Sequence, residues 1–227
     1  MRWLAPLAVL VGLAVAAPAD ADATLDGVSV HTNERTTQAV TVKHTRGWHA
    51  RVTYWTRDPG GPWQARRHAV DGRTGYGGLV RAAYRSQGSG TTPLGTFGLP
   101  SFFGTHEQSD AWRLPYRRIR PGDYWVQDNE SDYYNRYRNK DQGGFRWWLP
   151  SSHADGSERL TDFRQPYEYA IVTSFNRDQV RHRGAGIFLH VNGSGATAGC
   201  VSAPRWLLRY LVRVLDPARN PVVAVGR

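Results

Sequence analysis

Short segments rich in Val, Thr, Tyr and Trp recur along the chain, with turn-forming residues between them. Segments of this length and composition are typical of β-strands. The pattern predicts strands at residues 38–43, 49–56, 63–70, 167–174, 186–191 and 221–225. Between the second and third segments, residues 57–62 read Arg-Asp-Pro-Gly-Gly-Pro, and these residues suit a reversal of the chain. We therefore expect a mainly β fold that begins as a hairpin meander.

A helical pattern is clear near the end of the chain, at residues 203–215. Ser202 is expected to cap this helix, Pro204 suits its first turn, and Asp216 with Pro217 should end it. The apolar residues with helical spacing are expected to pack on the sheet, and they are Leu207, Leu211, Val214 and Leu215. Arginines four apart form a stripe that is expected to be solvated, namely Arg205, Arg209 and Arg213.

Residues 100–165 differ from the rest of the chain because they are rich in aromatic residues and weakly periodic. A long insert of this kind is typical of a lid or of a wall that contacts substrate, since its aromatic content argues against disorder. The alternative is that the rings form a satellite core beneath a long loop. Both interpretations stay open at the level of the sequence.

The first 23 residues have the layout of a secretory signal peptide. A basic start is followed by an apolar run over residues 3–17, and small residues then offer cleavage after Ala21 or Ala23. The run is short for a membrane-spanning helix, and no cysteine follows it that could carry a lipid anchor. We expect a secreted or cell-wall-associated protein without a membrane anchor after cleavage, in which residues 24–227 form one domain.

The charge of the chain is strongly positive. Without residues 1–23 the chain keeps 28 of its 29 basic and 17 of its 19 acidic residues, a formal net charge of +11. Such a charge favours anionic surroundings, for example wall polymers or nucleic acid. An arginine-rich composition with a well-solvated surface explains it equally. The sequence contains no recognisable nucleic-acid-binding motif, so no nucleic-acid partner is expected.

Cys200 is the single cysteine of the chain, so it cannot form a disulfide within the fold. An intermolecular bridge, a reactive thiol and an inert buried thiol are the three alternatives. Gly199 would let the backbone turn beside the sulfur and leave amide groups for an oxyanion, and the predicted helix start would lower the thiol pKa. His190, at the end of an apolar strand, could accept the thiol proton and return it to a leaving amine. A spacing of ten residues is by itself compatible with coincidence.

Two segments in this order resemble the L,D-transpeptidase (YkuD) family. Residues 187–190 (Ile-Phe-Leu-His) together with residues 197–201 (Thr-Ala-Gly-Cys-Val) resemble its catalytic signature, and residues 92–97 (Thr-Pro-Leu-Gly-Thr-Phe) resemble its T-P-x-G-x-F element. Residues 114–118, 121–125 and 133–135 also resemble a wall-associated subset of these proteins, more weakly.

The resemblance implies a YkuD-like β-sandwich catalytic domain with a long aromatic-rich loop insert. It implies that Cys200 attacks a peptidoglycan tetrapeptide stem before its terminal D-alanine, and that an amine of a second stem resolves the thioester into a cross-link. His190 would be the general base, the carbonyl of Val191 or Asn192 would orient its ring, and Gly199 with Cys200 would supply oxyanion donors. Neither a metal nor another cofactor is implied.

The sequence departs from the family pattern at two positions near the cysteine. Ala198 replaces the usual second histidine, Ser202 replaces the usual arginine or asparagine, and the spacer after His190 is short. The expected nucleophile and base are retained, while the acceptor stays open. Candidate substrate contacts are Ser202, Thr197, Tyr133, Tyr134, Asn135 and Trp147.

Other functions were weighed on the same residues. The remaining histidines show no metal-ligand spacing, although His153 and His182 precede the catalytic strand and are kept as distant candidates. Ser194 lacks the G-x-S-x-G context of a serine hydrolase. An L,D-carboxypeptidase is the alternative within the same chemistry, and a wall-binding module that stacks glycan on Trp147 and Trp148 is the alternative outside it.

Overall fold

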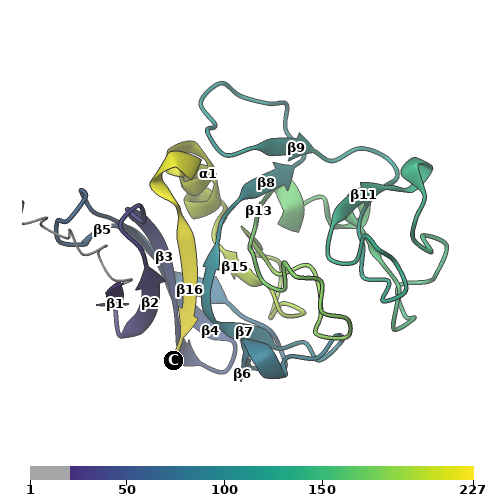
Figure 1. Ribbon diagram of the computed structural model, residues 1–227, viewed down its shortest axis with the longest axis horizontal. Coiled ribbons are helices and arrows are strands. Elements are labelled where there is room, and N and C mark those ends of the chain that lie inside the picture. Colours follow the sequence, from purple (N-terminus) through teal and green to yellow (C-terminus); the bar gives the residue numbers. More distant parts are fainter. Residues whose placement is uncertain (1–20) are drawn as a thin grey trace, which may run out of the picture.

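Eleven strands pair into one mixed sheet within residues 21–227, the part of the chain that the computed structural model describes (Figure 1). In pairing order they are β6 (Leu79–Arg81), β7 (Thr92–Gly98), β16 (Val222–Gly226), β3 (Gln38–Arg46), β4 (His49–Thr56), β5 (Gln64–Arg73), β15 (Val201–Ala203), β14 (Phe188–Val191), β13 (Tyr169–Val172), β8 (Ser101–Gly104) and β9 (Tyr116–Arg118).

Two smaller sheets and a few helices complete the described structure. The hairpin β1 (Ala21–Leu25) and β2 (Val28–Thr32) lies at one end of the molecule, and a sheet of β11 (Tyr137–Asn139), β10 (Asp123–Trp125) and β12 (Glu158–Arg159) lies at the other (Figure 1). The helices are α1 (Arg205–Val214) and the short 3-10 turns η1 (Ala82–Tyr84), η2 (Lys140–Gln142), η3 (Leu160–Phe163), η4 (Pro166–Glu168) and η5 (Pro217–Arg219).

The expected fold class, mainly β with a minor helical part, is confirmed. All six predicted strands are present: β4 has the predicted bounds, and the other five differ at one or both ends. The largest apolar core contains residues from both halves of the main sheet, for example Val40 and Val52 from one half and Ile171 and Leu189 from the other. Both halves therefore enclose one core, as in a sandwich, although hydrogen bonds join all eleven strands into a single sheet.

Strands β13 and β14 are buried at every position, as is typical of strands that are covered on both faces. β14 and β15 run parallel, with Leu189 opposite Val201 and His190 opposite Ser202. Because side chains alternate along a strand, Leu189 and Val201 point to one face, where they join the core that contains α1. Phe188 and Cys200 join a second core on the other face.

Helix α1 closes the first face, and its buried residues include Leu207, Leu211 and the following Leu215. The predicted start of this helix was wrong. Ser202 lies in β15, where its hydroxyl donates to Asn192 Oδ1 at 2.7 Å, and Pro204 is the N-cap, without a side-chain hydrogen bond. Pairing of residues 201–203 with β14 takes precedence over the local capping preference.

The aromatic segment 100–165 is more regular than the sequence indicated. Its first part supplies β8 and β9 of the main sheet, and its second part forms the small sheet. These strands of two to four residues are too short to show a period in the sequence, and the longer stretches between them are loops, as predicted. Many of its rings are buried: Phe103, Trp125 and Tyr134 pack with Phe188, while Tyr124 packs edge-to-face on Phe145.

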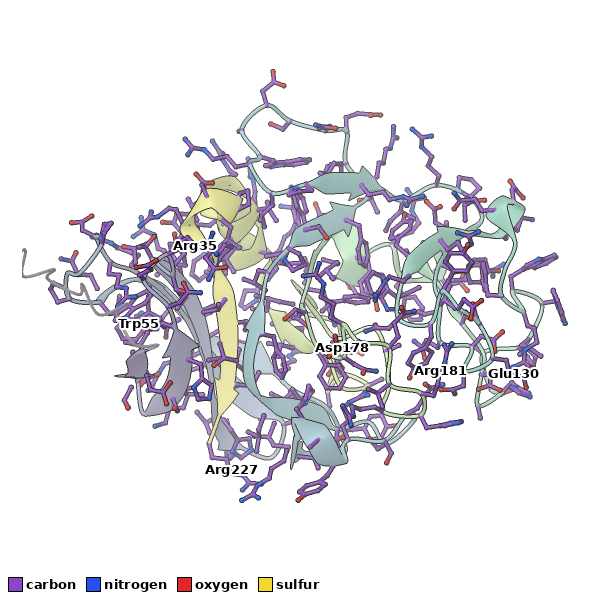
Figure 2. All side chains as sticks on the ribbon, in the orientation of Figure 1. Arg35, Trp55, Glu130, Asp178, Arg181 and Arg227 are labelled. Carbon is purple, nitrogen blue, oxygen red and sulfur yellow. The ribbon has the colours of Figure 1, made fainter. Side chains whose placement is uncertain are left out.

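Figure 2 labels side chains at both ends of the molecule, among them Trp55 at one end and Arg181 at the other. Trp55 packs against the apolar cluster of the β1–β2 hairpin. At the other end, Arg181 donates to the carbonyl of Ser131 and lies over the ring of Tyr134. These contacts tie the 176–184 loop to the connection between β10 and β11.

The predicted signal peptide lies mostly outside the described residues, which begin at residue 21. The described chain starts with β1, so cleavage after Ala23 would remove the first three residues of this strand, whereas cleavage after Ala21 would remove one. Within residues 21–227, no helix has both the length and the apolar character that crossing a membrane requires.

Candidate active site

A cavity of about 870 Å³ opens on the face of β14 and β15 that lies away from α1. Its floor includes Cys200 and His190, and its walls come from the 193–198 loop and from residues 147–151 and 156–159 of the aromatic segment. Arg85, Glu158 and Tyr167 also line it. Strand pairing and the aromatic segment thus bring five chemically functional side chains together.

Cys200 follows the 193–199 loop directly and precedes β15, and its side chain is buried. Its Sγ donates to the carbonyl of Gly186 at 3.1 Å and accepts from the amide of Phe188 at 3.3 Å. Burial raises the pKa of the thiol to about 12, and the charge of Glu158 acts in the same direction. At neutral pH the sulfur is therefore a thiol, which needs a base before it can attack.

The expectation that the helix start lowers the pKa of Cys200 was wrong. Helix α1 begins only at Arg205, with β15 between it and the cysteine. The stabilisation of a charge by a helix end fades within about one turn. Desolvation of the sulfur consequently outweighs it.

His190 is the last but one residue of β14, and its side chain is buried at the floor of the cavity. Its Nδ1 lies 2.8 Å from the carbonyl oxygen of Val191. Because a carbonyl oxygen only accepts, Nδ1 carries the proton and Nε2 keeps a free lone pair. Burial lowers the pKa of His190 to about 4, so the ring is neutral at physiological pH. The carbonyl of Asn192, the other expected partner, accepts instead from Gln165 at 2.9 Å.

The side chains of Cys200 and His190 lie on the same face of the sheet. Phe188 is the β14 residue level with Cys200, and His190 is two positions further along the same strand. Both side chains also line the same cavity. Among residues 21–227, no hydrogen bond joins the two side chains, since the sulfur is engaged by Gly186 and Phe188. Catalytic hydrogen bonds often close only when substrate is bound.

Glu158 carries a carboxyl group that lines the cavity and that the sequence analysis did not identify. It lies on β12, accepts from the hydroxyl of Tyr167, and has Gln127 Nε2 at 3.4 Å. Burial raises the pKa of Glu158 to about 7. Burial, together with the neighbouring carboxylate, also raises the pKa of Tyr167 far above its usual value, and the Tyr167 ring stands edge-on to His190 at 5.5 Å. No motif marks this pair, because the two residues meet only through the small sheet.

Arg85 is another cavity-lining residue that the sequence analysis did not identify. It follows η1 directly and is only 6% exposed. Its Nε donates to the carbonyl of Thr91 at 2.8 Å, and its Nη1 donates to that of Arg183 at 3.2 Å. Burial lowers the pKa of the guanidinium. Its closeness to the Thr92–Phe97 element was the one available sequence indication.

Gly199 directly precedes Cys200 and lies against the guanidinium of Arg85. Its φ of +127° is rare for residues with side chains, and a Cβ there would lie 2.8 Å from Arg85 Nη2. The amide of Gly199 donates to Thr197 Oγ1 at 3.2 Å, and this hydroxyl donates to the Cys200 carbonyl at 2.6 Å. Thr92 of the upstream element also lies against that carbonyl, at 3.4 Å. The two segments that carry the sequence resemblance are therefore neighbours in space.

The predicted substrate contacts divide into two groups. Thr197 and Trp147 line the cavity. The other four candidates, Ser202, Tyr133, Tyr134 and Asn135, are not part of its lining. Tyr134 and Asn135 are buried supports instead: Tyr134 donates to Gln87 Oε1, and Asn135 Oδ1 accepts from Trp125 and Gly186.

No group of three or more His, Cys, Asp or Glu side chains that could hold a metal ion occurs in residues 21–227. His153 is exposed near the cavity wall and His182 is exposed on the 176–184 loop. His182 donates its backbone amide to Asn129. Neither histidine lines the cavity.

Comparison with known proteins gives one structural match. No protein-family model matches the chain, and no curated protein matches it. A solved structure of an L,D-transpeptidase from Xylanimonas cellulosilytica is similar at a TM-score of 0.37 and 13% identity, over 84% of this chain and 61% of that one. The chain thus spans less than two thirds of that structure. Because the likeness is this low, the proposals below rest on the residues of this chain.

Proposed function

We propose that the protein is a cysteine acyltransferase that acts on peptidoglycan stem peptides, an L,D-transpeptidase. One observation carries the proposal. The buried thiol of Cys200 and the neutral imidazole of His190 lie on the same face of the β14–β15 pair and line one cavity. The imidazole proton is fixed on Nδ1, so Nε2 is free to act as a base. Nucleophile, base and orienting group are the parts that acyl transfer requires.

In the proposed reaction, His190 Nε2 accepts the proton of the Cys200 thiol as Sγ attacks the carbonyl carbon before the terminal D-alanine. The carbon–nitrogen bond then breaks, the proton passes from His190 to the leaving amine, and a thioester stays on Cys200. An amine of a second stem attacks the thioester, gives its proton to His190, and departs with the acyl group. The sulfur leaves as a thiolate and regains that proton.

The high pKa of Cys200 shapes this proposal. A thiol with a pKa of about 12 is almost wholly protonated at neutral pH, so proton transfer to His190 accompanies attack rather than precedes it. Substrate must also displace the sulfur from its backbone contacts with Gly186 and Phe188. We expect slow alkylation of the free enzyme, and faster reaction with acylating substrates that fill the cavity.

Intact mass tests the proposal directly. Wild type incubated with a tetrapeptide stem, or with a carbapenem as an acylating probe, is expected to gain a covalent adduct, whereas Cys200→Ala should gain none. Ser194→Ala serves as the matched control, because it changes a cavity-lining residue without a proposed role in the chemistry. Products that contain a new cross-link support transpeptidation, and products of hydrolysis support the carboxypeptidase alternative. Absence of any adduct on wild type would contradict acyl transfer.

A further inference from the structure

Arg85 is a buried cation without an acidic partner. It is only 6% exposed, yet none of the ion pairs within residues 21–227 includes it. Its hydrogen bonds go to the carbonyls of Thr91 and Arg183, which fix the guanidinium without neutralising its charge. Burying an unpaired charge is costly, so such groups usually meet a ligand or perform chemistry.

The free side of this guanidinium faces the candidate active site. Nε and Nη1 are occupied, whereas Nη2 has no hydrogen-bond partner among the described residues. Arg85 lines the same cavity as Cys200 and His190, and Nη2 lies against Gly199, the residue before the nucleophile. The φ of +127° at Gly199 and the absence of a side chain there keep this approach open.

The position of Arg85 beside the residue that precedes the nucleophile limits which anion its guanidinium can bind. In a peptide attacked by Cys200, the scissile carbonyl carbon and the carboxylate carbon of the next residue are separated by only N and Cα, about 4 Å at most. A carboxylate at this place exists only when the leaving residue is the last of its chain. Guanidinium groups bind carboxylates through charge-assisted hydrogen bonds.

We propose that Arg85 binds the α-carboxylate of the leaving residue and so restricts the acyl donor to peptides that end one residue after the scissile bond. The inference rests on the proposed function, since it names the donor of that same site. Arg85 thereby acts as a specificity-determining residue: it distinguishes a terminal residue from an internal one, while Cys200 and His190 carry out the transfer.

Binding of a non-reacting complex tests the inference without turnover. In a Cys200→Ala background, a tetrapeptide stem with a free terminal carboxylate is expected to bind about 10- to 100-fold more tightly than the same peptide with a terminal carboxamide, by calorimetric titration. Adding Arg85→Gln, which keeps amide donors and removes the charge, should abolish this difference. Arg209→Gln, on the exposed face of α1, is the control and should preserve it.

The outcomes separate the two proposals. Equal binding of acid and amide in the Arg85-containing protein overturns the inference, and this arm needs no variant of Arg85 that must fold. If Arg85→Gln instead slows alkylation of Cys200 and leaves the acid–amide ratio unchanged, Arg85 stabilises the thiolate and the inference is wrong. Failure of acyl transfer itself appears separately, as the lack of an adduct on wild type.

Discussion

Side chains that alternate along β14 and β15 enter two different environments. On one face, Leu189 and Val201 meet the leucines of α1 in an apolar core. On the other face, Phe188 and Cys200 meet rings of the aromatic segment, and the same surface holds His190 and the cavity. Both faces are buried, but the second also holds titratable side chains that line the cavity, namely Arg85, Glu158, Tyr167, His190 and Cys200. Burial of apolar side chains on the first face stabilises the fold, whereas holding neutral and charged groups at the cavity on the second face costs part of that stability.

The largest effect is expected from His190 on the cavity face. His190→Gln should lower the rate of Cys200 acylation by about 10²- to 10⁴-fold, the usual contribution of a general base, and should leave the fold intact. Single-turnover mass spectrometry measures the rate, and thermal unfolding checks the fold. The matched control is His68→Gln, which changes an exposed histidine on β5 and should acylate normally. An unchanged rate in His190→Gln would remove the assigned base.

The second largest effect is expected from a substitution in the apolar core between α1 and the sheet. Leu211 of α1 is fully buried in the apolar core, so Leu211→Ala should lower the free energy of unfolding by about 3 kcal/mol. Acylation per folded molecule should stay close to that of wild type, because α1 does not line the cavity. Urea unfolding gives the free energy. Arg213→Ala, an exposed position of the same helix, should change it by less than about 0.5 kcal/mol.

The contrast between the faces also explains what the sequence could predict. Helical spacing of Leu207 and Leu211 and the apolar strand before His190 follow from local periodicity, and both were predicted correctly. Ser202 was assigned wrongly because strand pairing between β14 and β15, a long-range contact, decides its place.

On the cavity face, Cys200 and His190 were predictable because each stands out locally, as the single thiol and as a histidine at the end of a strand. Glu158 and Arg85 reach the cavity from distant segments, and neither carries a local pattern. Their place in the cavity lining depends on contacts between distant segments, which no single window of the sequence shows. The direction of the Cys200 pKa was missed for the same reason: the helix start was visible locally, whereas desolvation by the aromatic segment was not.

A smaller effect separates two titratable groups of the cavity lining, Glu158 and His190, by their pH dependence. The pKa of Glu158, about 7, is above the ordinary 4.5, so its contribution to stability is complete below pH 4.5 and is lost as pH rises through 7. The pKa of His190, about 4, is below the ordinary 6.5, so its contribution is lost as pH falls from 6.5 to 4. The two trends partly cancel in wild type.

Glu158→Gln should remove the first trend alone. The free energy of unfolding of this variant, relative to wild type, is expected to increase from pH 4.5 to about 7.5 and then to level off, as measured by urea unfolding across this range. Alkylation of Cys200 above pH 7 should also become faster, because the charge that raises the thiol pKa is gone. Glu34→Gln, at an exposed carboxylate, is the control. A difference that is flat with pH would show that Glu158 titrates normally.

The smallest effect concerns two exposed tryptophans, one at the cavity and one on helix α1. Trp148 is 63% exposed and lines the cavity, whereas Trp206 is 50% exposed on α1 and does not. An aromatic contact worth about 1 kcal/mol corresponds to about a fivefold change in binding, so Trp148→Ala should raise KM for a stem peptide about fivefold and leave kcat unchanged. Trp206→Ala should change neither constant, since its ring contacts solvent away from the cavity. Equal effects of both substitutions would mean that exposed rings act through general solubility or wall adhesion, and the aromatic wall would then have no specific part in binding the stem.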